Sequence, residues 1–500
     1  MANTSQTDFE SGRCGRTPLG LLAVVFLVGF VTLPARQYPG DPNAWREEAR
    51  SLLVQGRLGV DSEIAGALGE RGQFFVRNPQ DGRWYSKYGI VNTLLNTVPL
   101  LVEYAVTGSL PPWDSPDRVF FLGLFFLLLA AAIAHTLYQV TGFYSDSSAA
   151  RVTFVLLAFY TTYLWNYLRA TNSESTQLLC FLLLYLWYQR FKRRGGPLAT
   201  RPRHHLYVAW LALALLCQTR VSYLLFVPVF AASLAVLAWR ERLPRSAWLS
   251  FAGRALILPM VLLLAAQAGV HQLKFGNPLL SGYHQWWDSD NPHSVWDVLY
   301  DFLISWQWSF FVNFPLLLLA LPGVRRFLSR HPDESTFLLV CFLLTFALVE
   351  PLPFWRGEYA YGPRYFVFLF PLLALPALYP LEWAFARPKQ PGRAALRTVL
   401  LLSGTFLVFA QLQVHRLPFF FKYSIRPNLP GVKGGVVNDY FDTTPFAKIN
   451  WDHLHCNNHW DRLPYYAELC RAQSPEARRI WEANLRWQLS QCNLYWFADP

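Results

Sequence analysis

The sequence predicts an all-α integral membrane protein. Of its 500 residues, 53% are hydrophobic and 17% aromatic, and only 15% are charged, which is too little charge for an ordinary soluble surface. Apolar runs long enough to cross about 30 Å of hydrocarbon recur along the chain. The net charge of +12 arises mostly from Lys and Arg in the short loops between these runs. That placement indicates membrane topology, so no nucleic-acid partner is predicted.

The first apolar run, from Leu19 to Leu33, follows a polar segment, 1–17, that ends with Arg13 and Arg16. Because no A-x-A-type cleavage site follows, we interpret the run as a signal anchor with a cytoplasmic N-terminus. Ten further runs are predicted to span the membrane: 118–140, 151–168, 175–190, 205–219, 222–239, 250–270, 306–323, 335–352, 364–384 and 396–414.

Loop charge predicts the orientation. Sixteen Lys and Arg lie in one set of loops, 190–203, 240–245, 325–330 and 387–397, which the positive-inside rule places in the cytoplasm. The facing segments, 169–174, 219–222, 271–305 and 353–364, hold five. Segment 90–107 is interrupted by Asn92, Asn96, Pro99 and Glu103. Between the outer first loop and the cytoplasmic loop at 190 the chain must cross the membrane an odd number of times, which leaves three crossings and excludes 90–107 as a fourth. We therefore expect a re-entrant or interface-lying helix there and about eleven spans in total.

These boundaries divide the chain into three parts. Residues 18–414 form the predicted membrane domain, whose first outer loop, 36–108, is unusually long and therefore expected to be functional. Residues 415–500 form an outer tail with one predicted helix that starts near Ser474. Three cysteines inside apolar runs are predicted to be buried and free: Cys180, Cys217 and Cys341. In the tail Cys456, Cys470 and Cys492 could pair, and which of them do so is open.

Two residues of the long outer loop could carry chemistry. Asp41 precedes Pro42 and opens a predicted amphipathic helix that Gly56 ends, so it could cap the helix, act as a base, or do both. Lys87 stands where the loop returns to the membrane between Tyr85 and Tyr88. It could be a snorkelling anchor of the aromatic belt or a ligand for a lipid phosphate.

Three more charges lie in the facing segments: Glu174, Arg220 and Arg364. Each could be an ordinary solvated loop charge. The predicted topology, however, puts all three on the same face as Asp41 and Lys87. Acids for proton transfer beside cations for a phosphate suit glycosyl transfer from a lipid phosphate.

Segment 271–305 contains possible metal ligands, but their spacing fits no recognised cluster. They are His271, His284, Asp288, Asp290 and His293. The many Trp and Tyr residues around them favour a membrane belt or a sugar-stacking surface. No cofactor and no metal-ligand set is predicted, and a divalent metal remains open.

Several short motifs together resemble the GT-C glycosyltransferases, which include protein O-mannosyltransferases and lipid A aminoarabinose transferases. They lie in order over most of 19–415: Gly40-Asp41, Tyr85-Ser86-Lys87-Tyr88-Gly89, Thr171…Glu174, Ser305…Phe311…Pro315…Pro322-Gly323 and Trp355…Tyr361-Gly362-Pro363-Arg364-Tyr365. Two features depart from the family. Pro42 stands where many members have a second acid, and the tail matches nothing in it.

The resemblance implies inverting sugar transfer, with or without a metal. Asp41 would be the general base, Glu174 an auxiliary acid, and Lys87 and Arg364 the ligands of the donor phosphate. Arg220, on the same predicted face, is expected to bind the phosphate with them. The implied substrate-binding residues are Tyr85, Tyr88, Trp355, Tyr361 and Tyr365.

The sequence thus predicts a multi-pass glycosyltransferase of the inner (cytoplasmic) membrane whose active site faces away from the cytoplasm. Its expected partners are membrane lipids, a polyprenyl-phosphate-linked sugar and a cell-envelope acceptor, which could be a glycan, a lipid or a protein. Two alternatives stay open: a polymerase or ligase for lipid-linked oligosaccharides, and a polytopic transporter or flippase. A transporter would place paired charges at mid-bilayer.

Overall fold

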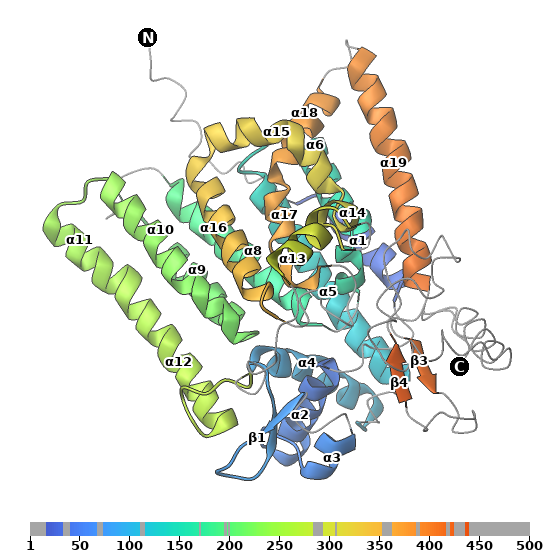
Figure 1. Ribbon diagram of the computed structural model, residues 1–500, viewed down its shortest axis with the longest axis vertical. Coiled ribbons are helices and arrows are strands. Elements are labelled where there is room, and N and C mark those ends of the chain that lie inside the picture. The colour runs from blue at the N-terminus through green and yellow to red at the C-terminus, as the bar shows by residue number, and fades with distance from the viewer. Residues whose placement is uncertain are drawn as a thin grey trace.

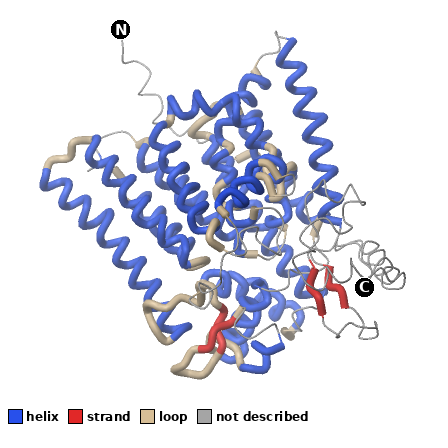
Figure 2. Tube along the Cα trace, in the orientation of Figure 1, coloured by secondary structure: helices blue, strands red, loops and turns tan. Residues whose placement is uncertain are grey.

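The computed structural model describes residues 17–33, 41–67, 74–110, 116–169, 172–194, 198, 201–283, 294–305, 308–352, 363–386, 391–416, 421–424 and 436–439. Helices make up most of this part of the chain (Figures 1 and 2). Its elements are α1 (Leu19–Val31), α2 (Asp41–Gln55), α3 (Ser62–Ala67), β1 (Phe75–Arg77), β2 (Trp84–Ser86), α4 (Val91–Thr107), α5 (Pro116–Thr141), α6 (Ser148–Tyr160), α7 (Leu164–Leu168), α8 (Ser173–Lys192), α9 (His204–Cys217), η3 (Val221–Leu225), α10 (Phe226–Arg240), α11 (Arg245–Phe251), η4 (Ala252–Ile257), α12 (Leu258–Phe275), α13 (Val295–Leu303), α14 (Phe310–Asn313), α15 (Leu316–Arg330), α16 (Pro332–Val349), η6 (Arg364–Phe366), α17 (Phe370–Leu373), η7 (Leu375–Ala377), α18 (Leu378–Phe385), α19 (Pro391–Arg416), β3 (Phe421–Ser424) and β4 (Val436–Asp439).

Within the described residues, five helical stretches are long and apolar enough to cross a membrane: Phe120–Thr141, Val221–Arg240, Arg245–Phe275, Pro332–Val349 and Gly392–Leu412. Leu19–Val31, Ser148–Tyr160 and His204–Cys217 are apolar but shorter. The chain is a multi-pass membrane protein, as predicted. The number of eleven spans and the orientation remain predictions.

Two predicted runs are broken into short helices. Run 306–323 covers α14 and the first half of α15, which are separated at Phe314 and Pro315. Run 364–384 covers η6, α17, η7 and nearly all of α18. Pro371 and Pro376 stand near the starts of α17 and η7. Proline has no backbone N–H to continue a helix, so these breaks follow from the sequence.

The centre of the bundle is α8, which packs against α9 and α5. Its side chains are buried along nearly the whole helix and include Phe181, Leu184 and Tyr185 at 0% exposure. A helix that is buried all round belongs in the middle of a bundle. The three cysteines predicted to be buried and free, Cys180, Cys217 and Cys341, are both.

Residues 41–107 form a small layer at one end of the bundle, made of α2, α3, the β1–β2 hairpin and α4 (Figure 1, bottom). As predicted from the sequence, helix α2 begins at Asp41 and ends before Gly56. The φ of Gly56 is +66°, which suits a glycine after a helix. The hairpin, which pairs Val76 with Tyr85, was not predicted. Helix α4 buries Asn92, Asn96 and Glu103 and exposes apolar residues such as Leu94 and Leu101, as suits a helix whose outer face meets lipid.

A buried ion pair holds this layer against the bundle. Glu48 of α2 is 0% exposed and lies 3.1 Å from Nζ of Lys274, in the last turn of α12. The Glu48 carboxylate also accepts hydrogen bonds from the Ser86 backbone N–H (2.6 Å), the Ser86 hydroxyl (2.8 Å) and the Thr93 hydroxyl (2.6 Å). Lys274 donates to the Ser86 hydroxyl and to the Tyr88 carbonyl, both at 2.8 Å. Four elements, α2, β2, α4 and α12, are thereby joined.

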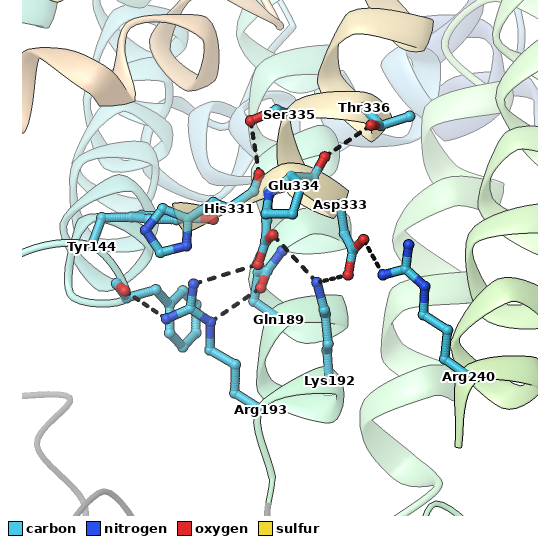
Figure 3. A network of polar contacts seen from close by, with 12 residues as sticks. Tyr144, Gln189, Lys192, Arg193, Arg240, His331, Asp333, Glu334, Ser335 and Thr336 are labelled. Atoms are coloured by element: carbon cyan, nitrogen blue, oxygen red, sulfur yellow. Dashed lines mark hydrogen bonds and ion pairs between the residues drawn. The ribbon is translucent and has the colours of Figure 1, made fainter. Parts of the chain in front are cut away.

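A second charge network lies at the far end of α8, about 30 Å from its first turn at 1.5 Å per residue. Figure 3 shows Lys192 of α8, Arg193, which directly follows that helix, and Arg240 of α10 around Asp333 and Glu334 of α16. Lys192 Nζ lies 2.8 Å from Asp333 and 3.3 Å from Glu334, and Arg193 lies 3.5 Å from Glu334. The sequence places these basic residues in the cytoplasmic loops, and here they tie three helices together.

The described part of the tail is one antiparallel hairpin, in which β3 pairs with β4. The tail helix predicted near Ser474, and Cys456, Cys470 and Cys492, lie outside the described residues. The predicted division of the chain at residue 415 remains a prediction.

Removing one member of the Glu48–Lys274 pair should strongly destabilise the fold. Glu48→Gln leaves the Lys274 charge buried without its counter-ion, so we expect a loss of about 3–5 kcal/mol, measured as a lower Tm of the detergent-purified protein. Asp61→Asn, which removes a half-exposed partner of Arg57 in the same layer, should cost less than about 1 kcal/mol. Equal stability of Glu48→Gln and wild type would show that the pair is not structural.

Candidate functional site

Three chain segments meet where the outer layer joins the bundle. A Cβ added to Gly89 would lie 1.8 Å from the Gln218 carbonyl oxygen, and one added to Gly282 would lie 2.4 Å from Lys87 backbone atoms. Such close approach is possible only for glycine. Segment 87–89 is therefore held between 218–220, after α9, and 281–283, beyond α12.

Arg220 lies at this junction and pairs with Glu174. Glu174 stands in the first turn of α8, where the helix dipole favours a carboxylate and where Asn172 caps the helix. Its Oε1 lies 3.2 Å from Nη2 of Arg220, and both residues are buried. Arg220 Nε is also buried and has no hydrogen-bond partner among the described residues. Burial disfavours the Arg220 charge, but Tyr283 and Glu174 outweigh it and raise the Arg220 pKa above its usual value.

The segment at Arg364 joins Arg220 through an aromatic ring. The guanidinium carbon of Arg220 lies 5.3 Å from the centre of the Tyr365 ring, and that of Arg364 lies 5.1 Å from it. The Tyr163 hydroxyl donates to the carbonyl of Pro363 at 3.2 Å and so ties this segment to the loop between α6 and α7. Arg220 and Arg364, which are 144 positions apart in the sequence, thus both lie against the Tyr365 ring.

Lys87 is 9% exposed and surrounded by rings. Its Nζ lies 5.3 Å from the ring centre of Tyr88, 5.6 Å from that of Tyr283 and 5.7 Å from that of Phe74. Because Gly89 packs on the carbonyl of Gln218, two residues before Arg220, Lys87 and Arg220 belong to one region. The structure therefore brings six of the predicted residues together: Lys87, Tyr88, Glu174, Arg220, Arg364 and Tyr365.

Asp41 is the first residue of α2, one turn before Trp45. The Trp45 ring contacts the Tyr88 ring edge-on, with centroids 5.2 Å apart, and Tyr88 in turn contacts Tyr283. The start of α2 therefore lies next to the Lys87 region. Trp355 and Tyr361 lie outside the described residues.

Tyr85 lies apart from this region. It is buried with Val76 and Phe275, and Gly59 packs against its ring. Its hydroxyl donates to Asp81 at 2.6 Å, and burial together with Asp81 raises its pKa. These contacts give Tyr85 a structural place in the hairpin, and its substrate-binding role is still a prediction.

Three residues that shape the site are not predicted from the sequence: Glu48, Lys274 and Tyr283. The predicted run 250–270 is too short, because α12 continues to Phe275 and Lys274 therefore lies in the helix and not in an outer loop. Glu48 falls between Trp45 and Ala49, on the buried side of α2, and a carboxylate in that position was the available signal. No sequence pattern singled out Tyr283 from the aromatic residues around it.

No metal cluster can be built from the described residues, among which no three His, Cys, Asp or Glu lie together. His271 is buried in α12, and its Nε2 lies 2.7 Å from Nε2 of Gln267. The other possible ligands, His284, Asp288, Asp290 and His293, lie outside the described residues.

No protein-family model matches the sequence, and no curated protein matches it. Among solved structures, the chain is similar to ArnT from Cupriavidus metallidurans bound to undecaprenyl phosphate, with 13% identity and a TM-score of 0.46 over 79% of this chain and 70% of ArnT. It is also similar to the oligosaccharyltransferase AglB from Archaeoglobus fulgidus in complex with an inhibitory peptide and a dolichol-phosphate, with 13% identity and a TM-score of 0.49. This second similarity covers 93% of this chain but 59% of AglB. At these values the similarity assigns neither a family nor an activity to this chain.

Proposed function

We propose that this chain is a membrane glycosyltransferase that moves a sugar from a polyprenyl-phosphate donor to an extracytoplasmic acceptor. One observation carries the proposal: Lys87, Arg220 and Arg364, far apart in the sequence, converge at the end of the bundle where α2 begins. Three cations and one paired carboxylate leave an excess of positive charge there, which suits a phosphate.

The proposed reaction is an in-line displacement. The acceptor hydroxyl oxygen attacks the anomeric carbon, its proton passes to the Asp41 carboxylate, and the bond from that carbon to the phosphate oxygen breaks. The electron pair of that bond leaves with the polyprenyl phosphate, and the anomeric configuration inverts. The cations stabilise the charge that develops on the leaving phosphate. Tyr88 and Tyr365 would line the sugar and phosphate positions.

The site would face away from the cytoplasm. This follows from the loop charges, because Lys192, Arg193 and Arg240 belong to the opposite end of the bundle from Arg220. The acceptor would be a cell-envelope glycan, lipid or protein. No step of the proposal uses a metal or a cofactor, and an assay arm with EDTA tests that.

The direct test is release of polyprenyl phosphate from a panel of polyprenyl-phosphate sugars, with cell-envelope extract as acceptor. Wild type should release the lipid phosphate with at least one donor. Asp41→Asn should lower kcat by about 10²-fold or more, because it removes the base, yet it should fold normally because Asn also caps helices.

The matched control for this variant is Asp61→Asn, which changes a half-exposed carboxylate of the same outer layer. It should retain wild-type turnover. Full activity of Asp41→Asn would refute the base assignment. No release by folded wild type with any donor would instead favour the flippase or an oligosaccharide-linked donor.

A second variant tests the phosphate site. Lys87→Met should raise the apparent KM for the lipid donor by about tenfold or more, since a charge-assisted contact to the phosphate is lost. Arg57→Met, at a half-exposed cation of the same layer, is the control and should leave KM unchanged. An unchanged KM in Lys87→Met would remove Lys87 from the phosphate site.

A further inference from the structure

The segment that follows α12 returns over Lys87. Helix α12 ends at Gly276, whose φ of +71° lets the chain reverse. Gln80 of the β-hairpin turn donates to the Gly276 carbonyl at 2.9 Å, and Asn78 donates to the Leu273 carbonyl at 3.2 Å. The hairpin turn thereby fixes the end of α12, and residues 277–283 lead from there to the site.

At the end of this segment, Gly282 and Tyr283 fix Lys87 from two directions. The backbone of Gly282 lies so close to the backbone of Lys87 that a Cβ would meet it at 2.4 Å. The Tyr283 ring completes the cage of three rings around the Lys87 ammonium and packs edge-on against Tyr88, at 5.9 Å between centroids. An ammonium held among ring faces is attracted to them and loses freedom to move.

The segments that carry Tyr283 and Arg220 both pack on residues 87–89. Gly282 packs on the Lys87 backbone, and Gly89 packs on the carbonyl of Gln218, two residues before Arg220. The electrostatic interaction of Tyr283 with Arg220 agrees with this arrangement. The proposed reaction gives Tyr283 no role.

We propose that Tyr283 is a positioning residue that holds the Lys87 ammonium beside Arg220, so that the two cations form a single anion site. The ring supplies the effect, because it is the ring face that meets the ammonium. A contribution of Tyr283 to donor binding rests on the proposed function. The holding of the Lys87 ammonium by Tyr283 follows from the contacts alone.

The cage is tested without turnover by acetylating the detergent-purified full chain with an N-hydroxysuccinimide ester and measuring Lys87 modification by mass spectrometry. Tyr283→Leu should raise the Lys87 rate about fivefold or more, whereas Tyr283→Phe, which keeps the ring, should stay within about twofold of wild type. Gly282→Ala should act like Tyr283→Leu, since the added Cβ pushes the segment off Lys87.

Two control variants accompany these. Gly269→Ala, in α12, adds a Cβ that meets nothing within 4 Å, and Tyr300→Leu removes an exposed tyrosine of α13. Both should leave Lys87 labelling unchanged. Equal labelling of wild type and Tyr283→Leu would overturn the proposal, and so would equal increases in Tyr283→Phe and Tyr283→Leu.

The donor assay then tests the positioning role. Tyr283→Leu should raise the donor KM about fivefold with kcat within about twofold of wild type, and Tyr283→Phe should restore the wild-type KM. A fall in kcat alone, or no rescue by Phe, would contradict it. If wild type transfers no sugar, the proposed function fails, while the labelling result still decides whether Tyr283 holds Lys87.

Discussion

The Glu48–Lys274 ion pair is the interaction on which the candidate site depends. Two fully buried charges are tolerable only when each is satisfied, and here the carboxylate accepts four hydrogen bonds while the ammonium also binds a hydroxyl and a carbonyl. Those partners include Ser86 and Tyr88, the two neighbours of Lys87. The position of Lys87 relative to α12 is therefore set by contacts one residue away on either side. The same pair anchors the last turn of α12, from which the segment carrying Tyr283 departs.

Close backbone packing then brings the cations together. Gly89 lies directly on the Gln218 carbonyl, two residues before Arg220, and Gly282 lies directly on Lys87. Lysine and arginine in one region repel one another unless counter-charge or ring faces intervene. Glu174 supplies the counter-charge at Arg220, and Tyr365, Tyr88 and Tyr283 supply the ring faces. These surroundings stabilise the cluster of like charges.

The helices and the grouping of the charged residues could be predicted from the sequence, because local patterns determine them. Contacts between residues far apart in the chain could not. Hydrophobic runs predict helices because a bilayer demands them, and Gly56 ends α2 as predicted. The prolines near the starts of α17 and η7, in contrast, interrupt run 364–384, which was predicted to be one span. Loop charge grouped Lys87, Glu174, Arg220 and Arg364 on one face. Pairings between distant residues leave no local pattern, which is why Glu48 with Lys274, the β1–β2 hairpin and the place of Tyr283 were missed. The partner of Tyr85 was likewise not predicted: it stands two residues from Lys87, yet its own hydroxyl is bound to Asp81.

The contacts of Glu174 also bear on how two acids would share the chemistry. The Glu174 carboxylate lies 3.2 Å from Arg220, and both side chains are buried. A carboxylate bound in this way orients the guanidinium. Asp41 heads a helix on the outer layer, and Trp45, one turn later, already contacts the aromatic residues around Lys87. In the proposed reaction Asp41 would therefore take the proton, and Glu174 would hold the cation that meets the phosphate.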